Sequence, residues 1–336
     1  MGTFSVIYDL FAKRLRLSNP WNYKAPVLVA VTYLILAWQK VAFLDALFAF
    51  GWSLCTIIGI AGFGYLSNDF GDRKADAKAG KSNLLIGLSR MQISGLLVLF
   101  LALAVVPWLV YFPVTALTIS LLLSEFLLFI LYVLPPFRLK ERGLLGVITD
   151  SLYAHAVPAT LAGLTFLVLL PTENQAFPIF LPTLVVWQFF LGMRNILLHQ
   201  LKDAKNDRVS GIHTFVTRHG EAKVNRWMSN LFVPLELLTW LLFLGALTPV
   251  TWLPLLGWPL YLLWQFPKQG PHREFRQWLY GYLDDFYIPY FPLLILISLC
   301  FQDWRMIFLA VFHVILFKSA LSETKRRVFA WIRKPL

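Results

Sequence analysis

The sequence predicts an all-α, polytopic transmembrane helical bundle with nine or ten spans. Of its 336 residues, 58% are hydrophobic and only 14% are charged, whereas soluble domains average about 45–50% and about 25%. The apolar residues also gather in blocks of about 17–25 residues, the length that crosses a hydrocarbon core roughly 30 Å thick. A soluble enzyme is therefore excluded. The two cysteines, Cys55 and Cys300, lie inside apolar blocks and cannot form a disulfide framework.

The chain begins with an amphipathic segment, residues 1–22, in which apolar side chains alternate at helical spacing with Lys13, Arg14 and Arg16. This pattern predicts an interfacial helix. The bundle is predicted over 23–322, and a basic tail over 323–336. Because the break at Gln302-Asp303 is short, the last two apolar blocks are either two spans or one bent helix with a surface segment. The predicted spans are 25–41, 44–67, 91–112, 115–134, 147–171, 178–201, 227–246, 249–266, 287–302 and 304–321.

Charge placement predicts the orientation. With ten alternating spans and a cytoplasmic N-terminus, only Lys40 and Arg305 of the 30 Lys and Arg residues fall on the far side. Nine spans would place the basic tail outside, which the same rule disfavours. The net charge of +12 therefore indicates topology and contact with the lipid bilayer, not nucleic-acid binding. We expect a multi-pass protein of a bacterial plasma membrane or an organellar membrane, with its chemistry in the long cytoplasmic loops, 68–90, 135–146, 202–225 and 267–286.

A repeated acidic motif lies in two of these loops. Asp72-x-x-x-Asp76-x-x-x-Gly80 recurs as Asp203-x-x-x-Asp207-x-x-x-Gly211, 131 residues later at every shared position. Each copy follows an even-numbered span. This spacing predicts two four-helix repeats, about 25–134 and about 147–266, followed by C-terminal spans over 287–321.

The spacing of the carboxylates indicates what they can bind. Residues four apart lie on one helix face, so each Asp pair is aimed in one direction and can share a cation. Mg²⁺ takes oxygen ligands and usually binds through one or two carboxylates together with phosphate oxygens. Neighbouring cations suit a polyanionic ligand such as a diphosphate: Arg73, Lys74, Lys78, Lys81, Lys202, Lys205 and Arg208. The alternative is a solvated helix end with local salt bridges, which the duplication in register makes less favourable.

Other polar residues lie within the spans: Glu125, Asp150, His155, Arg194, Asn195 and Glu236. Arg194 and Asn195 precede Asp203 on one helix, so we expect them either to bind substrate or to pair with an acid. Glu125 and Glu236 are expected to be an internal structural pair or protonated residues. His199 and His213 rank below the acids as ligands. The segment 280–286, with Asp284-Asp285, is either part of a lid or acceptor site or, more favoured, an interfacial helix with aromatic anchors.

Three motifs resemble a known family. Asn68-Asp69-x-x-Asp72-x-x-x-Asp76 is similar to the first aspartate motif of the UbiA superfamily of intramembrane prenyltransferases, and Asp203-x-x-x-Asp207 to the second. The segment 132–140, YVLPPFRLK, resembles a stretch found in the chlorophyll synthase and homogentisate prenyltransferase branches. Together the motifs cover about 25–247. Val133, the possible tenth span and the segment 280–286 depart from the pattern and leave the acceptor open.

The resemblance implies a central cavity, capped on the cytoplasmic side, in which Mg²⁺ binds a prenyl diphosphate. It implies Asn68, Asp72, Asp76, Asp203 and Asp207 as metal ligands, Asp69 as a supporting or substrate-activating acid, and Tyr132 near the reacting carbon. It also implies diphosphate contacts from Arg73, Arg138 and Lys140, to which Lys78, Lys202, Arg194 and Asn195 are added as candidates. For Lys140, simple anchoring on the positive side is nearly as favoured.

The resemblance therefore implies a Mg²⁺-dependent enzyme that ionises an allylic prenyl diphosphate and transfers the isoprenoid to an acceptor, with an aromatic ring as one candidate. A terpene cyclase of the same family would use the same metal and diphosphate site without an acceptor. A transporter or binding protein is a distant third alternative, because the loops on the far side are short and almost uncharged.

Overall fold

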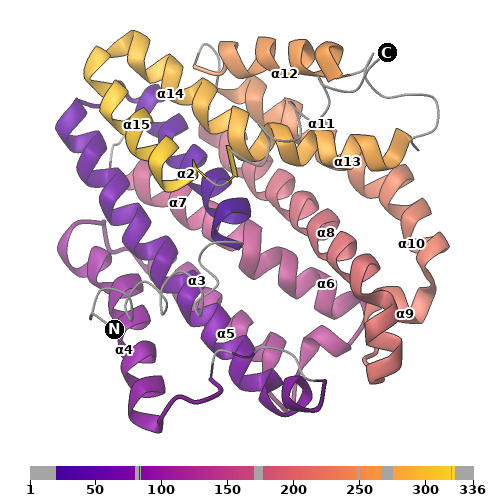
Figure 1. Ribbon diagram of the computed structural model, residues 1–336. Coiled ribbons are helices and arrows are strands. Elements are labelled where there is room, and N and C mark those ends of the chain that lie inside the picture. The colour runs from indigo at the N-terminus through magenta and orange to yellow at the C-terminus, as the bar shows by residue number, and fades with distance from the viewer. Residues whose placement is uncertain are drawn as a thin grey trace. The chain divides into compact units, whose positions relative to one another are not determined.

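The computed structural model describes residues 20–79, 83, 85–169, 177–247, 250–265, 275–318 and 320–321, and these form helices and connecting turns with no strand (Figure 1). The all-α prediction is confirmed. The predicted interfacial helix over 1–22 lies almost wholly outside the described residues, and so does the tail over 323–336. The chain divides into two compact units, which we describe separately. Among the described residues, unit 1 comprises Trp52–Phe243, and unit 2 comprises residues 20–51 and 244–321.

Seven helices in the described part of the chain are long and apolar enough to cross a membrane. They are Phe43–Arg73, Arg90–Val110, Ala116–Val133, Leu144–Leu169, Pro178–Val209, Glu221–Ala246 and Leu279–Gln302, with shorter apolar helices at Lys24–Trp38 and Trp304–Leu316. Large apolar side chains point outward from these helices, for example Leu109 and Leu123, as a lipid-facing surface requires. The membrane fold agrees with the sequence, while nine or ten spans and two four-helix repeats remain predictions.

Unit 1 contains most of α3, the helices from α4 to α10 and most of α11. Their bounds are α3 (Phe43–Ala79), α4 (Arg90–Val110), α5 (Ala116–Val133), the 3₁₀ turn η2 (Leu139–Glu141), α6 (Leu144–Ser151), η3 (Leu152–Ala156), α7 (Val157–Leu169), α8 (Phe177–Ser210), α9 (Phe215–His219), α10 (Glu221–Trp227), η4 (Met228–Phe232) and α11 (Val233–Ala246). The wider π turns η3 and η4 join their neighbouring α-helices into continuous spans. Capping boxes at Ser89 and Thr115 fix where α4 and α5 begin.

Two helices extend well beyond the hydrocarbon core. The 37 residues of α3 and the 34 of α8 correspond to about 55 Å and about 51 Å of helix, against a core about 30 Å thick. The prediction that 68–79 and 202–210 are loops is therefore wrong, because both spans continue through these polar residues without a break. The continuation places both aspartate motifs on regular helix, where residues four apart share a face.

Two close helix contacts in unit 1 depend on glycine. A Cβ added to Gly71 of α3 would lie 2.1 Å from Val133 Cγ1 of α5, and one added to Gly192 of α8 would lie 2.8 Å from Ser151 Cα of α6. Because only a residue without a side chain fits at such separations, these glycines allow the helices to approach. The first contact holds the end of α5 against the residue that precedes Asp72.

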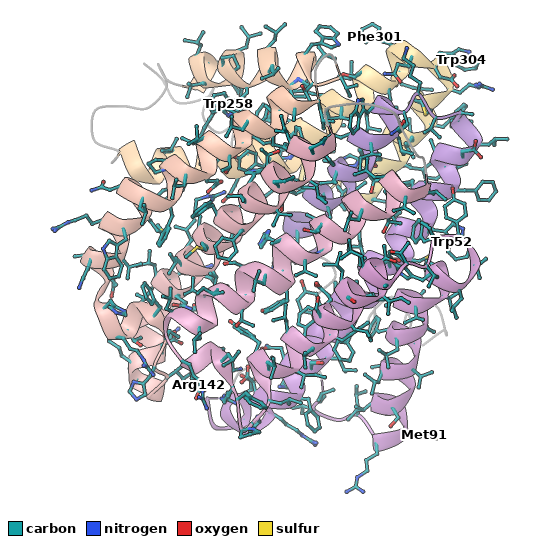
Figure 2. The ribbon with its side chains drawn as sticks, turned by 180° about the vertical axis from the view of Figure 1, so that it is seen from behind. Trp52, Met91, Arg142, Trp258, Phe301 and Trp304 are labelled. Atoms are coloured by element: carbon teal, nitrogen blue, oxygen red, sulfur yellow. The ribbon has the colours of Figure 1, made fainter. Side chains whose placement is uncertain are left out.

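Unit 2 contains α2 (Pro20–Trp38), the start of α3, α12 (Trp252–Gln265), α13 (Phe275–Asp285), η6 (Phe286–Tyr290), α14 (Phe291–Gln302), η7 (Trp304–Met306) and α15 (Ile307–Leu316). Gln302 Nε2 donates to the carbonyl oxygen of Ala37 at 3.0 Å, and Tyr33 Oη lies 3.2 Å from His313 Nδ1. Helices α14 and α15 are separate, with Asp303 between them. Phe301 and Trp304, on either side of this break, project outward (Figure 2).

The segment 280–286 is not an exposed interfacial helix with aromatic anchors. Tyr280 and Tyr282 are buried in unit 2, and Tyr282 Oη donates to the carbonyl oxygen of Trp258 at 2.8 Å. The ring of Tyr282 also stacks on that of Tyr261, with centroids 5.2 Å apart. The tyrosines that suggested anchors are packing residues, a distinction that composition alone does not make.

Candidate functional site

The first aspartate motif occupies the last turns of α3. Asp69 is 5% exposed, whereas Asn68, Asp72 and Asp76 are half-buried. Asn83 folds the following loop back onto this helix, because its Nδ2 donates both to the Asp69 carbonyl oxygen and to Asp76 Oδ2, each at 2.8 Å. The motif is thus held by its own loop, through a residue that the sequence did not single out.

Asp72 binds two cations from the connection between α5 and α6. Arg138 Nη2 lies 3.2 Å from Asp72 Oδ1, and Lys140 Nζ contacts the same oxygen. Arg138 Nη1 also donates to the carbonyl oxygen of Gly71 at 3.1 Å. Burial lowers the pKa of the Lys140 ammonium, and the Asp72 carboxylate opposes that shift. The predicted metal ligand and the predicted diphosphate contacts therefore meet.

The connection that supplies these cations has an unusual backbone. Arg138 has φ +41°, in the left-handed region that non-glycine residues rarely occupy, and the Pro135-Pro136 bond is cis. Arg138 is held there by its own N–H, which donates to the Leu134 carbonyl oxygen at 2.9 Å, and by Glu141 Oε1, which accepts from its Nε at 2.6 Å. Glu141 thus fixes the direction of the guanidinium.

The second motif lies on the last turns of α8. Asp203 and Asp207 are half-buried, one turn apart, and His199 Nδ1 lies 3.1 Å from Asp203 Oδ2. Lys202 is exposed, and Arg208 Nη1 pairs with Glu221 Oε1 of α10 at 3.0 Å. His199 therefore contacts the motif, as an exposed side chain one turn before Asp203.

Hydrogen bonds link the surroundings of the two motifs. Arg218 of α9 donates from Nη2 to the Glu141 carbonyl oxygen at 2.9 Å and from Nε to the His213 carbonyl oxygen at 3.2 Å. The chain just after α8 is thereby joined to the connection whose Arg138 binds Asp72. Figure 1 shows α3 and α8 running to the same end of unit 1, and Figure 2 places Met91, in the first turn of α4, and Arg142, in the connection between α5 and α6, at that end.

Carboxylate and amide oxygens are a donor set that suits Mg²⁺. No group of three or more His, Cys, Asp or Glu side chains in the described residues is gathered closely enough to hold an ion by itself. Mg²⁺ is usually bound by one or two carboxylates together with waters and substrate phosphates. The residues present fit the metal by their chemistry.

The other predicted site residues are distributed unevenly. Arg73 is exposed at the end of α3, Asn195 is half-buried on α8, and the side chain of Lys78 lies outside the described residues. Tyr132 is buried at the end of α5, and its ring meets that of Tyr153 edge to face, with centroids 5.0 Å apart. The structure thus brings Asp72, Arg138 and Lys140 into direct contact and leaves the other roles as predictions.

Arg194 is placed differently from a diphosphate ligand. Its side chain is fully buried, and its Nε and Nη2 bind Glu236 Oε2 and Oε1 at 2.8 and 3.1 Å. Of the two expectations for Arg194, pairing with an acid is the one observed. Glu236 thus has a cationic partner, which the sequence had not assigned to it.

Sequence reasoning missed Asn83, Glu141, Arg218 and Tyr153. Glu141 and Tyr153 carry a usable signal, because each follows its partner, Arg138 or Asp150, by three residues, the spacing of a local contact. Asn83 and Arg218 act across loops or between helices, where sequence spacing gives no guide.

Three comparisons place the chain among known proteins. A sequence model of the UbiA prenyltransferase family matches residues 25–287. No curated protein matches the chain. Among solved structures, a UbiA homolog from Archaeoglobus fulgidus bound to GPP and Mg²⁺ superposes with a TM-score of 0.52 at 16% identity, covering 85% of this chain and 99% of that one.

The same homolog bound to DMAPP and Mg²⁺ gives a TM-score of 0.52 at 15% identity, covering 85% of this chain and 98% of that one. At these identities the structures establish a shared fold alone. The family match, however, spans most of the sequence and includes both aspartate motifs. The chain belongs to the UbiA prenyltransferase family.

Proposed function

We propose that this protein is an integral membrane prenyltransferase that ionises an allylic prenyl diphosphate in the presence of Mg²⁺ and transfers the isoprenoid to an acceptor. The observation that carries the proposal is the contact of Asp72 with Arg138 and Lys140. It places groups suited to a metal ion beside groups suited to a diphosphate. The A. fulgidus homolog, of the same fold, was solved with GPP and Mg²⁺ and with DMAPP and Mg²⁺, which supports the same substrate class here.

In this proposal Asn68, Asp72, Asp76, Asp203 and Asp207 hold Mg²⁺. Bound Mg²⁺ supplies positive charge that stabilises the departing diphosphate. Arg138 and Lys140 bind diphosphate oxygens once their contacts with Asp72 are exchanged for contacts with the substrate. Glu141 keeps Arg138 oriented during this exchange, because it binds Nε and leaves Nη2, the nitrogen that contacts Asp72, for the ligand.

The buried rings next to this end of unit 1 suit the isoprenoid. Phe129 and Tyr132 line the last turns of α5, and Tyr153 packs against both, with centroids 4.3 and 5.0 Å away. Aromatic faces stabilise an allylic cation by cation–π contact, and their burial keeps water from it. An aromatic acceptor is proposed on the resemblance noted above. A terpene cyclase would need the same groups and is the second candidate.

We propose further that this end of unit 1 lies on the cytoplasmic side of a bacterial plasma membrane, or on the equivalent side of an organellar membrane. The distribution of Lys and Arg favours this orientation. A Met91→Cys variant in a Cys55→Ser, Cys300→Ser background tests the side, because Met91 is 82% exposed at this end. Labelling of intact cells by a membrane-impermeant maleimide should fail, and labelling of inverted vesicles should succeed. The reverse pattern would contradict the orientation.

The function itself is tested with the purified protein, Mg²⁺ and geranyl, farnesyl or geranylgeranyl diphosphate, with and without a panel of phenolic acceptors. Diphosphate release that depends on an acceptor and yields a prenylated product supports the transferase. Release without an acceptor, together with a cyclic hydrocarbon, supports the cyclase. No release, with diphosphate binding unchanged in Asp72→Ala and Asp203→Ala, would exclude both. Asp45→Ala, at the opposite end of α3, is the matched control.

A further inference from the structure

Asp150 is a buried carboxylate for which the reaction outlined so far has no use. It lies in the span Leu144–Leu169, six residues or about 9 Å from its start, and is 7% exposed. Tyr153 Oη donates a hydrogen bond to Asp150 Oδ2 at 2.5 Å. Among the ion pairs of the described residues, none includes Asp150. Ionisable side chains within membrane spans are rare and costly, so a functional role is the first explanation for Asp150.

A wall of aromatic residues connects Asp150 with the aspartate motif of α3. Tyr153 packs on Phe129 and on Tyr132, with ring centroids 4.3 and 5.0 Å away. Val133, the next residue, contacts Gly71 beside Asp72. Asp72 therefore lies at one end of this wall and Asp150 at the other.

The proposed chemistry requires a base. When the allylic C–O bond breaks, its electron pair leaves with the diphosphate, and an electron pair of the acceptor forms the new bond to carbon. The acceptor must then lose a proton. In the cyclase alternative, a proton leaves a carbon next to the cation and the C–H pair becomes a double bond. Either reaction ends with one proton to be removed.

Asp72 and Asp150 have different surroundings, and the difference favours Asp150 as the group that removes this proton. Asp72 is paired with Arg138 and Lys140 and is, in the proposed function, occupied with the metal and the diphosphate. Asp150 instead accepts a hydrogen bond from the Tyr153 hydroxyl at Oδ2. A hydroxyl in this position can pass a proton to the carboxylate.

Resting on the proposed function, we propose that Asp150 is the base that accepts the proton released at the end of the reaction, directly or through the Tyr153 hydroxyl. The inference concerns only this last step. It predicts that ionisation of the diphosphate and formation of product can be separated by mutation.

The test uses the full-length protein in detergent with Mg²⁺, geranyl diphosphate and the phenol that the wild type prenylates, or no phenol if the wild type forms a cyclic hydrocarbon. Two quantities are measured: diphosphate released, and the share of released geranyl groups found in the product as opposed to geraniol and linalool. The variants are Asp150→Asn, Asp150→Glu and Tyr153→Phe. Ser151→Ala is the control, since among the described residues Ser151 Oγ bonds the Val147 carbonyl oxygen of its own helix and no other group.

We expect Asp150→Asn to release diphosphate within about threefold of the wild-type rate while the share of geranyl in product falls at least about tenfold, a conservative figure for loss of a general base. Water then captures the cation. Asp150→Glu should restore part of the share, Tyr153→Phe should lie between, and Ser151→Ala should match the wild type.

The inference would be overturned if Asp150→Asn lowered diphosphate release and product formation by the same factor and Asp150→Glu restored neither. Asp150 would then be a structural residue. If Asp150→Asn does not remain monodisperse, Tyr153→Phe decides, because it keeps the ring and removes only the hydroxyl. An unchanged product share in that variant and in Asp150→Glu would overturn the relay and the base together. Absence of diphosphate release from the wild type is a different failure, since it removes the proposed function itself.

Discussion

Asp72 and Arg138, 66 residues apart in the sequence, are in direct contact, with Arg138 Nη2 3.2 Å from Asp72 Oδ1. The contact joins the end of α3 to the connection after α5, and Lys140 reinforces it at the same oxygen. Without a ligand, the negative charge of Asp72 is thus compensated by the positive charges of Arg138 and Lys140. A metal–diphosphate complex carries both signs and can replace each partner of this pair with one of its own, which is why the contact supports the proposed function.

Removal of Mg²⁺ should stop the reaction reversibly. Excess EDTA is expected to abolish diphosphate release, because the five predicted oxygen ligands have no cation to join to the diphosphate, and added Mg²⁺ should restore it. Diphosphate release measured by a coupled phosphate assay checks this. Persistent activity in EDTA would contradict a metal-dependent mechanism.

Glu141 should affect substrate binding more than chemistry. Glu141→Ala removes the acceptor for Arg138 Nε, so we expect the guanidinium to lose its fixed direction and the KM for the prenyl diphosphate to rise about tenfold, in line with the loss of a group that orients a ligand. Glu141→Gln keeps an oxygen acceptor and should lose less. Steady-state kinetics give the comparison, and an unchanged KM in Glu141→Ala would be inconsistent with the orienting role.

Gly71→Ala should disturb the site through packing. The added Cβ would lie 2.1 Å from Val133 Cγ1 and 3.0 Å from the Val133 carbonyl oxygen, so we expect a loss of about 1–3 kcal/mol of stability, typical of overpacking, and reduced diphosphate release. Adding Val133→Ala removes the nearer atom and should recover part of both. Thermal unfolding in detergent measures the first effect. No recovery in the double variant would show that the carbonyl contact dominates.

The Arg194–Glu236 pair should behave as a structural element. Each single alanine variant leaves a buried charge alone and is expected to cost about 3–5 kcal/mol, whereas Arg194→Met combined with Glu236→Leu should cost much less. The folded double variant should bind prenyl diphosphate with nearly wild-type affinity. A selective loss of diphosphate affinity in this stable variant would instead restore Arg194 to the predicted binding set.

The sequence was sufficient for the fold class and for the pairing of motifs with helices. Hydropathy predicted the apolar helices, and the repeated Asp spacing marked residues that lie in the last turns of α3 and α8. The helical continuation through residues 68–79 was missed, since its composition is that of a solvated loop and only packing, as at Gly71, keeps it in line with the span.

The sequence predicted some residues of the site and missed others, because contacts between distant segments leave no local pattern. Arg138 and Lys140 were found through their motif, but Lys140 could equally have been a lipid anchor until its contact with Asp72 was seen. Arg194 and Glu236 are separated by 42 residues and meet across two helices, a contact that helical spacing cannot report. Asn83 and Arg218 depend in the same way on how loops and helices close on one another.

The central claim is that both aspartate motifs bind one metal–diphosphate complex, and its most direct test is calorimetric binding of non-hydrolysable geranyl S-thiolodiphosphate in the presence of Mg²⁺. The account predicts that Asp203→Asn weakens binding as severely as Asp72→Asn, by about 10-fold to 100-fold, while Asp45→Asn binds like the wild type. Wild-type affinity in Asp203→Asn, with binding lost only in Asp72→Asn, would contradict a shared site.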